Sequence, residues 1–329
     1  MEEAMQPHAI SIIVVNYRTP KMTLDCLRSI DREAKDANYE ILLVDNASND
    51  GIIETVEREI PRVRCFALAN NVGFAQANNI AARQAKGRFL LLLNPDTLIL
   101  DHAIDRLFAF AARTPKAKIW GGMSLKGDRS IDTSCWRRVT LWSTICRTFS
   151  LDTAFPTSGL FNPEGYGNWD RLTVRDVDII CGCFMLIERD MWDRLNGFDG
   201  VFFMYGEEAD FCLRAAKAGA RPAYTPDARI IHYGGASQQA EAEKLIRRLS
   251  ARAELIQRHL SPGQRPVGLL INSLLPLVRA WGYNAIGRLS RNRQRLTQAD
   301  TWRQVWLRRS TWRDGLNKGA PLSAMSKVA

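Results

Sequence analysis

A chain of 329 residues, of which 46% are hydrophobic, can bury one large core or two modest ones, which excludes an intrinsically disordered protein. The net charge of +10 is unevenly placed, because residues 261–329 hold 12 Lys/Arg against two Asp/Glu, whereas the preceding residues hold 33 of each kind. Since the body of the chain is neutral, we expect no nucleic acid among its partners.

The cysteines and the N-terminal residues predict a cytoplasmic protein. The seven cysteines are odd in number and show no paired C-x-x-C spacing, and the sequence MEEAMQPHAI lacks the basic and apolar regions of a signal peptide. No stretch reaches the roughly 18 to 20 apolar residues that a membrane-spanning helix needs. The nearest one, VGLLINSLLPLV at 267–278, is short and is interrupted by polar residues and a proline.

Short apolar runs rich in β-forming residues alternate with amphipathic stretches in the first 123 residues. The apolar runs predict strands at residues 10–15, 39–45, 63–68, 88–93 and 117–123. The amphipathic stretches predict helices at residues 20–33, 49–59, 73–85 and 101–113. This alternation is typical of βαβ units and indicates an α/β fold, with an open, doubly wound sheet flanked by helices. Such a sheet binds ligands at the carboxyl ends of its strands.

The residues after the first, second and fourth predicted strands are NYRTP, DNASNDG and NPD. None of them is a glycine-rich phosphate loop, because the chain has neither G-x-G-x-x-G after a strand nor G-x-x-x-x-G-K-[ST]. A diphosphate can still be held through a divalent cation, with carboxylate oxygens on one side of the ion and phosphate oxygens on the other. Asp96, the acid of NPD, is the predicted ligand, and the alternative is an N-cap for a helix at 98–113.

Six sequence blocks resemble the inverting family 2 glycosyltransferases of the GT-A fold, and among these the rhamnosyltransferase-like branch. They are SIIVVNYRTP, ILLVDNASNDG, NNVGFAQANN, LLLNPD, the segment from DVDIICGCF to LRAAKAG, and ARIIHYGGAS. The resemblance covers residues 10–237, with the blocks in order and at fitting spacings. It implies a mixed sheet of the GT-A type. It also implies a metal-dependent enzyme that moves a sugar, here rhamnose from dTDP-rhamnose, from a nucleotide diphosphate to a hydroxyl group.

The resemblance implies a set of residues that contact the donor. Asp45 and Asp50 match the positions that contact its base and ribose, although they could also form an Asx turn and a cap for the helix at 49–59. Gly73 would allow a close approach, and the amides of Asn71 and Asn78 would supply neutral hydrogen-bonding groups, with an ordinary strand-to-helix turn as the alternative. The full nucleotide-sugar-binding set is Asn16, Asp45, Asp50, Asn71, Gly73, Asn78 and Asp96.

Asp96 and His232 are the expected ligands of the divalent metal, either Mg²⁺ or Mn²⁺. NPD departs from the D-x-D pattern of the broader superfamily but keeps its last acid, and one or two carboxylates together with substrate phosphates are enough for these ions. His232 matches a family histidine that contacts the metal or the diphosphate, and neutral imidazole suits Mn²⁺. A lone histidine without this context would more often be structural.

The segment FMYGEEADFCLR holds the predicted catalytic residues Glu207, Glu208 and Asp210. Inverting transfer needs a base that takes the proton of the acceptor hydroxyl. The family pattern is Glu-Asp-x-Asp with the second acid as base, so Glu208 is the predicted base, with glutamate in place of aspartate. The extra methylene shifts the carboxylate by about 1.5 Å, and misplacement on that scale can cost a large rate factor.

Three alternatives to this interpretation remain open. The acids could simply be the favourable first turn of a helix at 207–219. A catalytically impaired family member could act as a scaffold, because of the glutamate at position 208. A nucleotidyltransferase shares a similar sheet and a metal-binding aspartate, but it usually has a glycine-rich first loop, and VVNYRTPKM contains no glycine.

The expected domains follow from the extent of these patterns. Residues 127–174 are polar, aromatic and poor in periodicity, which is typical of a long functional loop on the acceptor side. Cys181 and Cys183 alternate in a predicted strand and are expected to be buried structural thiols on one face. The domains are a catalytic domain at 1–237 (nucleotide-binding half about 8–123, acceptor-side half 124–237), a closing helix at 238–262 and a basic tail at 263–329.

The tail is predicted to be helical and to contact an anionic membrane surface. Its arginines would meet lipid phosphates, while tryptophans would lie at the level of the headgroups. A helical tail packed on the body and a nucleic-acid-binding tail are the alternatives. With a nucleotide-sugar donor and a lipid-linked or polysaccharide acceptor, these features predict a peripheral enzyme of cell-envelope glycan synthesis at the inner face of the membrane. The tryptophans are Trp281, Trp302, Trp306 and Trp312.

Overall fold

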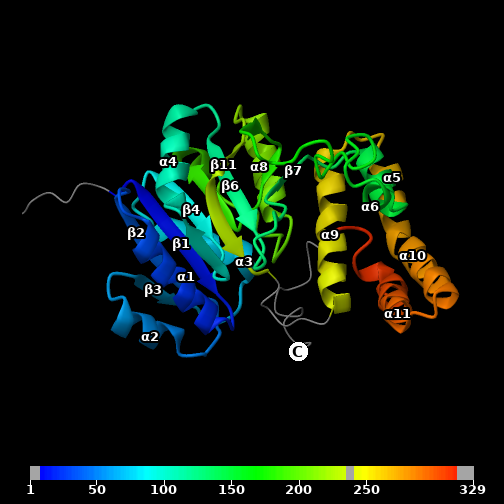
Figure 1. Cartoon of the computed structure of the whole chain (residues 1–329), viewed down its shortest axis with the longest axis horizontal. Coiled ribbons are helices and arrows are strands. Elements are labelled where there is room, and N and C mark those ends of the chain that lie inside the picture. Colours follow the sequence, from blue (N-terminus) through cyan, green and yellow to red (C-terminus); the bar gives the residue numbers. More distant parts are fainter. Residues whose placement is uncertain (1–7, 235–240, 317–329) are drawn as a thin grey trace, which may run out of the picture.

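The computed structural model describes residues 8–234 and 241–316, in which a sheet covered by helices is followed by a group of C-terminal helices (Figure 1). The first half of the sheet region alternates strands and helices as the sequence predicts. The observed strands lie within two residues of the predicted ones at both ends. The elements are β1 (Ile10–Asn16), α1 (Pro20–Glu33), β2 (Tyr39–Asp45), α2 (Ile52–Glu59), β3 (Arg64–Ala67), α3 (Gly73–Gln84) and β4 (Phe89–Leu93).

The second half of this region adds an antiparallel strand and so makes the sheet mixed. Its elements are β5 (Thr97–Leu100), α4 (Ala103–Arg113), β6 (Ile119–Leu125), β7 (Cys135–Trp136), α5 (Leu141–Thr148), α6 (Leu151–Ala154), β8 (Arg175–Asp176), β9 (Ile179–Ile180), β10 (Phe184–Glu188), α7 (Arg189–Arg194), α8 (Glu207–Lys217) and β11 (Ala223–His232). The strand order is β3-β2-β1-β4-β10-β6-β11-β5, with β8 paired to β11. Strand β10 runs antiparallel to both β4 and β6, while β1 to β4 are parallel. The predicted α/β fold with a doubly wound, mixed sheet is confirmed.

The core consists of two apolar layers, one on each face of the main sheet. Successive side chains of a strand point to opposite faces. In β1, Ile10, Ile12 and Val14 therefore join one layer, and Ile13 and Val15 join the other. Since both faces are covered by helices, the central strands are continuous apolar runs rather than alternating ones. This is why the sequence pattern identified them well.

Two short segments differ from the sequence prediction. Residues 97–100 form strand β5, antiparallel to β11 with Thr97 opposite His232, and α4 begins only at Ala103. Asp96 is therefore not the cap of a helix at 98–113. Cys181 and Cys183 lie in the turn between β9 and β10 rather than within a strand, and Cys181 is only half-buried. In both places the pairing partner is distant in the sequence, so local pattern could not reveal it.

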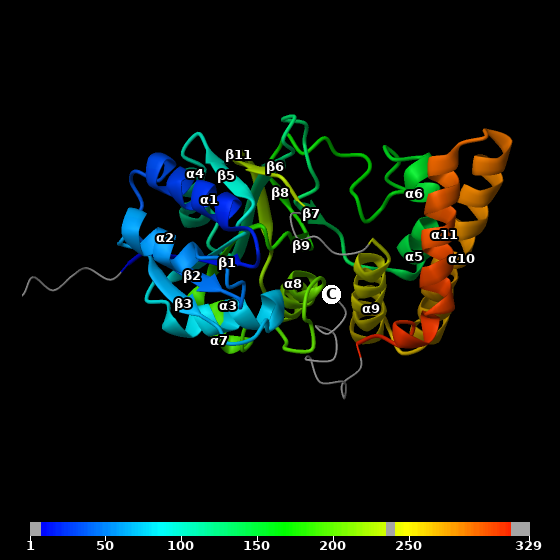
Figure 2. The same ribbon diagram turned by 90° about the horizontal axis from the view of Figure 1, so that it is seen from below.

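The segment at residues 127–174 is more ordered than its composition predicts. It contains α5, whose first turn is closed by a capping box in which Thr140 and Ser143 exchange hydrogen bonds between side chain and backbone. The segment is tied to the C-terminal helices by Glu164, whose carboxylate accepts hydrogen bonds from Arg252 at 2.7 and 2.9 Å. Figure 2 shows α5 and α6 beside the C-terminal helices.

The C-terminal residues form helices α9 (Glu241–His259), α10 (Arg265–Leu289) and α11 (Arg293–Leu307) and the short turn η1 (Arg309–Thr311). Helix α9 lies between α8 and the α10–α11 pair (Figures 1 and 2). Trp312 is fully buried among α9, α10 and α11, and Trp302 packs on the same cluster. Two of the four tryptophans thus serve the packing of the tail. Within the described residues, no helix is long and apolar enough to span a membrane.

Candidate active site

The carboxyl ends of β1 and β2 hold a buried polar cluster centred on Asn16. The Asn16 amide donates to Asp45 at 2.9 Å, Ser48 at 2.9 Å and Asp50 at 3.1 Å. The side-chain oxygen of Asn16 accepts a hydrogen bond at 2.8 Å from the hydroxyl of Thr23 in α1. Asn16 is fully buried and every polar atom of its side chain is used, so it fixes the positions of the two aspartates relative to each other.

Asp50 also stabilises the start of α2. One of its carboxylate oxygens accepts a hydrogen bond from the backbone N–H of Ile52 at 3.2 Å, as expected of a residue that precedes a helix. The other oxygen accepts from Asn16. Asp45 is buried and its second oxygen binds the backbone N–H of Ser48 at 3.2 Å. The structure therefore brings Asp45 and Asp50 together at one edge of the sheet.

The loop before α3 is fixed by a second set of amides. Asn46 donates to the side-chain oxygen of Asn71 at 3.0 Å, and that oxygen also accepts from the N–H of Gly73 at 2.9 Å. Gly73 has a φ of +82°, and a Cβ there would collide with the carbonyl oxygen of Phe203. Only glycine tolerates this conformation and this contact, so Gly73 holds the loop against the segment that leads to α8.

Asn78 lies inside α3, where its amide donates to the carbonyl oxygen of Phe74 at 2.9 Å. The side chain is 1% exposed, and its oxygen has no partner among the described residues. These contacts are internal to the helix, whereas Asn71 joins the loop at the sheet edge. An unpaired buried acceptor costs free energy, and no described residue offsets that cost at Asn78.

Asp96 and His232 lie next to each other at the ends of β4 and β11. The His232 Nε2 atom is 3.4 Å from the Asp96 carboxylate and 3.2 Å from the amide nitrogen of Asn94. Pairing of β5 with β11 fixes this approach, because Thr97 stands opposite His232. Burial lowers the pKa of His232, but the hydrogen bond and the charge of Asp96 outweigh it and raise the pKa above its usual value.

These two side chains fit a divalent cation. In an octahedral site with ligand distances of about 2.1 Å, neighbouring ligand atoms are about 3 Å apart. The observed 3.4 Å between the two ligand atoms is close to this separation. The described residues contain no group of three or more His, Cys, Asp or Glu that could hold a metal ion by itself. The remaining ligands would therefore have to come from substrate phosphates and water, as is common for Mg²⁺.

Glu207 and Glu208 form the first turn of α8, which begins after Gly206. Glu207 is buried, whereas Glu208 is partly exposed. Burial raises the pKa of Glu208, and burial together with the charge of Glu208 raises that of Glu207 still further. Each carboxyl has one oxygen without a hydrogen-bond partner in the described structure. Glu208 is therefore the more exposed residue of the pair, although its unpaired oxygen is buried.

The turn between β9 and β10 lies against Glu208 and also contacts the loop that carries Asp96. A Cβ at Gly182 would lie 3.8 Å from the Cβ of Glu208 and 3.4 Å from the ring of Phe74. The next residue, Cys183, accepts a hydrogen bond from the backbone N–H of Asn94 at 3.1 Å. The turn at Gly182, which has no side chain, therefore lies between Glu208 and Asn94.

Asp210 has a different environment from the two glutamates. Its carboxylate accepts from Arg214 at 2.7 Å and contacts His259 of α9 at 3.0 Å, and Arg258 lies 3.5 Å away. Although burial raises the pKa of Asp210, hydrogen bonds from His259 and Arg214 lower it below its usual value. Asp210 is fully buried, and its contacts join α8 to α9.

Comparison with known proteins identifies the family of the chain. The family model described as "Glycosyltransferase like family 2" matches residues 7–252, about three quarters of the chain. The chain belongs to glycosyltransferase family 2. This membership decides against the nucleotidyltransferase alternative, which the first loop already disfavoured. This family 2 enzyme is therefore a glycosyltransferase.

Relatives and solved structures extend the comparison. The rhamnosyltransferase WbbL of Escherichia coli strain K12 is 27% identical over 72% of this chain and 88% of its own length. N-acetylglucosaminyl-diphospho-decaprenol L-rhamnosyltransferase of Mycobacterium tuberculosis strain H37Rv is 25% identical over 68% of this chain and 76% of its own. The mannosyltransferase PcManGT from Pyrobaculum calidifontis, solved with GDP-Man and Mn²⁺, has a TM-score of 0.58 at 17% identity, over 94% of this chain and 88% of that one. The last likeness confirms the GT-A fold.

Several residues of this glycosyltransferase site were not singled out from the sequence. Asn46, Ser48 and Asn94 lie inside the motifs that were recognised, so a closer weighing of each polar residue could have found them. Gly182 and His259 carry no such signal, since one is a glycine in a turn and the other ends a long amphipathic helix. Their roles come from packing between elements that are distant in the sequence.

Proposed function

We propose that this enzyme is a metal-dependent inverting glycosyltransferase that moves rhamnose from dTDP-rhamnose to a hydroxyl of a lipid-linked acceptor in cell-envelope glycan synthesis. The observation that carries the proposal is the arrangement of three features at one sheet edge: the Asp45–Asp50 cluster, the Asp96–His232 pair and the acidic turn with Glu208. The choice of sugar and acceptor is supported by the names of the two rhamnosyltransferase relatives.

The donor would be held along the carboxyl ends of β1, β2 and β4. Asp45 and Asp50 face the nucleoside, supported by Asn16, and the loop at Gly73 leaves room for a close backbone contact. Asp96 and His232 would hold Mg²⁺ or Mn²⁺ beside the diphosphate. A bound cation of this kind stabilises the negative charge that develops on the departing nucleotide diphosphate.

Glu208 would act as the general base. Its raised pKa, caused by burial, makes the carboxylate a stronger proton acceptor than an ordinary glutamate. It would take the proton of the acceptor hydroxyl while the oxygen attacks the anomeric carbon from the face opposite the leaving diphosphate. Burial and the neighbouring charge of Glu208 raise the pKa of Glu207 further, which disfavours a second negative charge in the turn.

The proposal also places the enzyme at an anionic membrane surface on the cytoplasmic side. The exposed face of α10 carries Val267, Leu270, Leu277 and Trp281, spaced so that they form one stripe along the helix. Trp281 is 73% exposed. Arg288 in the last turn of α10 and Arg291 just after the helix are exposed, and such a combination of apolar and basic residues suits the headgroup region of a membrane.

Donor binding tests the proposal directly. We expect dTDP-rhamnose with Mn²⁺ or Mg²⁺ to raise the melting temperature, because a ligand that binds only the folded state stabilises it by mass action. Excess chelator should remove this shift and abolish transfer. Asp96→Ala should lose the metal-dependent part of the shift, whereas Asp101→Asn, at an exposed position just after β5, should keep it. Full transfer in excess chelator would contradict the metal requirement, and a larger shift with another nucleotide sugar would replace rhamnose.

A scaffold without catalytic activity remains the second candidate, because glutamate stands where the family has aspartate. Donor binding would then persist while no acceptor receives sugar at a rate above the background. The substitution Glu208→Asp separates the two cases. A gain of transfer on restoring aspartate would indicate an impaired base, and transfer by the unmodified enzyme would exclude the scaffold.

A further inference from the structure

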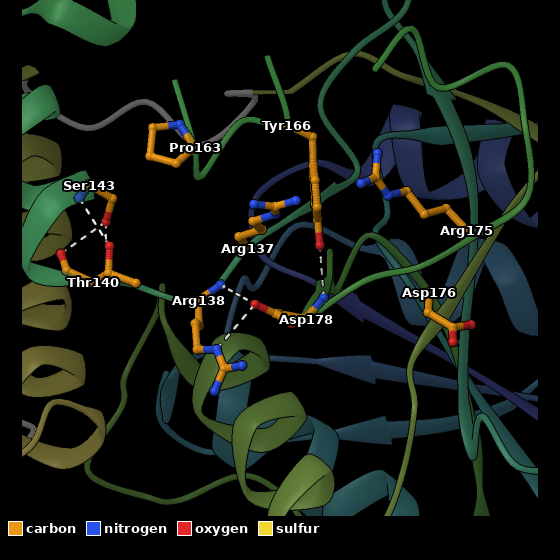
Figure 3. Close-up of a pocket in the computed structure, with 9 residues that line it drawn as sticks. All are labelled: Arg137, Arg138, Thr140, Ser143, Pro163, Tyr166, Arg175, Asp176 and Asp178. Atoms are coloured by element: carbon orange, nitrogen blue, oxygen red, sulfur yellow. Dashed lines mark hydrogen bonds and ion pairs between the residues drawn. The ribbon is translucent and has the colours of Figure 1, made fainter. Parts of the chain in front are cut away.

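Residues between positions 137 and 178, most of them in the predicted acceptor-side loop, line a pocket of about 390 Å³ (Figure 3). Three arginines line it, Arg137, Arg138 and Arg175, together with the buried ring of Tyr166. We call it the arginine pocket. All of its lining residues lie between positions 137 and 178, so none of the residues assigned to the donor or to the metal contributes to it.

Two of these guanidinium groups are held in place by an aromatic ring. Arg137 and Arg175 lie on opposite sides of Tyr166, each 4.8 Å from the ring centre (Figure 3). A ring attracts a guanidinium through its π-electrons but offers no carboxylate oxygen, so the N–H groups remain available to donate to a ligand. The Arg175 guanidinium carbon also lies 5.1 Å from the centre of the Trp169 ring. The two cations are therefore ordered but not neutralised.

The acidic residues of the pocket leave it with unpaired positive charge. Asp178 accepts from the backbone N–H of Arg138 at 2.9 Å and lies 3.5 Å from its guanidinium. Asp176 lines the pocket but is exposed. Across residues 8–234 and 241–316, no carboxylate lies within 4.0 Å of the guanidinium groups of Arg137 or Arg175. Because these two guanidinium groups lie on opposite sides of one ring, a ligand that contacts both must pass the edge of the ring, and a diphosphate carries phosphate oxygens at both of its ends.

A second, apolar cavity adjoins the arginine pocket. It has a volume of about 560 Å³ and shares Arg138 and Thr140 with the pocket. We call it the apolar groove. It runs between the start of α5 and the end of α9, and its lining includes Val139, Leu141, Trp142, Ile145 and Leu260. A charged pocket that opens into an apolar groove matches an amphipathic ligand with an anionic head and a hydrocarbon chain.

Both cavities lie within reach of the acidic turn. Asp178 in the arginine pocket is four residues before Gly182, which faces Glu208, and four extended residues span at most about 14 Å. His259 lines the apolar groove and contacts Asp210, which shares the first turn of α8 with Glu208. A short saccharide could bridge this distance between Glu208 and the arginine pocket.

We propose that the arginine pocket binds the diphosphate of a prenyl-diphosphate-linked saccharide acceptor, and that the apolar groove binds the first isoprene units of its lipid. This inference rests on the proposed function, because it assigns a site to the acceptor of that reaction. Arg137 and Arg175 would hold the phosphate oxygens through charge-assisted hydrogen bonds, with the saccharide extending toward Glu208 and the chain leaving along α5. The diphosphate thus fixes which sugar hydroxyl meets the base.

Binding of farnesyl diphosphate tests the site without donor or acceptor sugar. The titration is done in excess chelator, so that the donor site cannot take the diphosphate through a metal. We expect Arg137→Gln and Arg175→Gln each to weaken binding about tenfold or more, as loss of a charge-assisted contact does. Arg129→Gln, an exposed arginine of the same segment on the turn after β6, is the matched control and should bind like the wild type. Inorganic pyrophosphate should bind more weakly than farnesyl diphosphate, and Ile145→Ser should reduce that difference.

Two further measurements keep the test decisive. Arg137→Lys retains the charge and loses the fork, so it should bind with intermediate affinity if Arg137→Gln folds poorly. The affinity for dTDP-rhamnose with Mn²⁺ should stay unchanged in all of these variants. Unchanged farnesyl diphosphate affinity in folded Arg137→Gln and Arg175→Gln would overturn the inference, as would equal affinity for inorganic pyrophosphate. If the wild type does not bind dTDP-rhamnose, the proposed function is contradicted. The farnesyl diphosphate titration still decides whether the arginine pocket binds a prenyl diphosphate.

Discussion

Glu207 and Glu208 are adjacent acids with different environments, and this difference can be tested by substitution. Glu208→Gln removes the proposed base almost isosterically. We expect kcat to fall by about 10²- to 10⁴-fold while donor affinity is retained, because the base contacts only the incoming hydroxyl. Steady-state kinetics with saturating metal, together with donor titration, measure both effects. A near wild-type kcat in Glu208→Gln would move the role to another residue.

The neighbouring acids supply the controls for that experiment. Asp210→Asn should lower stability, because Arg214 and Arg258 would lose their shared carboxylate partner. Its effect should therefore show in the melting temperature before it shows in kcat. Glu207→Gln should lower kcat less than Glu208→Gln does, since Glu207 is buried and is not the proposed base. If Glu207→Gln alone abolished turnover, the assignment within the pair would be reversed.

The pH dependence of turnover follows from the raised pKa of Glu208. A base must be ionised to accept a proton, so kcat is full above this pKa and falls as the pH drops through it. Burial raises the pKa, so the fall should occur above the range of an ordinary glutamate, about 4.3. Donor binding must be followed at each pH, because His232 also gains a proton as the pH falls. A kcat that stays constant down to pH 4.3 would contradict this role of Glu208.

The sequence motifs predicted the positions of the acids and the histidine at the sheet edge, but not the hydrogen bonds that support them. Asp45, Asp50, Asp96 and His232 were all predicted to lie at the sheet edge, and the structure places them there in two clusters. The contacts of Asn16, by contrast, identify it as a support for the two aspartates, which required knowing that residues 45, 48 and 50 converge on one amide. Hydrogen-bond geometry of this kind depends on φ and ψ in the turns, which a sequence pattern does not specify.

Among the elements, those with strong local patterns were predicted well and those set by distant pairing were not. Strands β1, β2 and β4 are apolar runs that any βαβ arrangement would bury. Strand β5 is four residues long and exists because β11, more than 120 residues later, pairs with it. Helix α5 was missed because its anchor, Glu164 with Arg252, joins two segments 88 residues apart.

The anchor of α5 allows a prediction about stability. Glu164→Gln should destabilise the protein by about 3 to 5 kcal/mol, because it leaves the largely buried guanidinium of Arg252 without its counter-charge. Unfolding in urea at neutral pH measures this loss. The matched control is Glu243→Gln, which breaks the exposed pair with Arg308 and should cost less than about 1 kcal/mol.

The sign of the pH effect on this pair can be checked in the same experiment. Burial raises the pKa of Glu164, but Arg252 outweighs it, so the pKa is lower in the folded protein than in the unfolded chain. The stabilisation is present above the unfolded pKa and is lost as the pH falls through the folded pKa. The difference between wild type and Glu164→Gln should therefore shrink in acid. A difference that is constant with pH would mean that the carboxylate charge is not its source.

At the scale of the whole molecule, the composition shows that the tail carries the surplus of positive charge. It does not show which residues of the tail pack against the protein and which face outward. The sequence suggested that four tryptophans face a membrane together. The structure buries Trp312 and packs Trp302 in the cluster that joins α9, α10 and α11, which leaves Trp281 as the most exposed of the set. Composition cannot distinguish an indole that packs helices together from one that faces outward, because both occur in amphipathic helices.

This distinction changes how the membrane proposal must be tested. Removing the tail would expose the apolar surface of α9 and could disturb the whole protein, so single substitutions on the outer face of α10 are preferable. Leu270→Ser and Trp281→Ser should each reduce sedimentation with vesicles that contain phosphatidylglycerol, since each removes apolar contact area from the same stripe. Leu307→Ser on α11 is the matched control, because Leu307 is 64% exposed and Leu270 is 61% exposed.

Binding should also weaken as salt is raised, because the arginines contribute about 1 kcal/mol each near an anionic surface. Equal losses in Leu270→Ser and Leu307→Ser would show that α10 has no special role, and binding that is unchanged in every variant would place the contact with the membrane elsewhere.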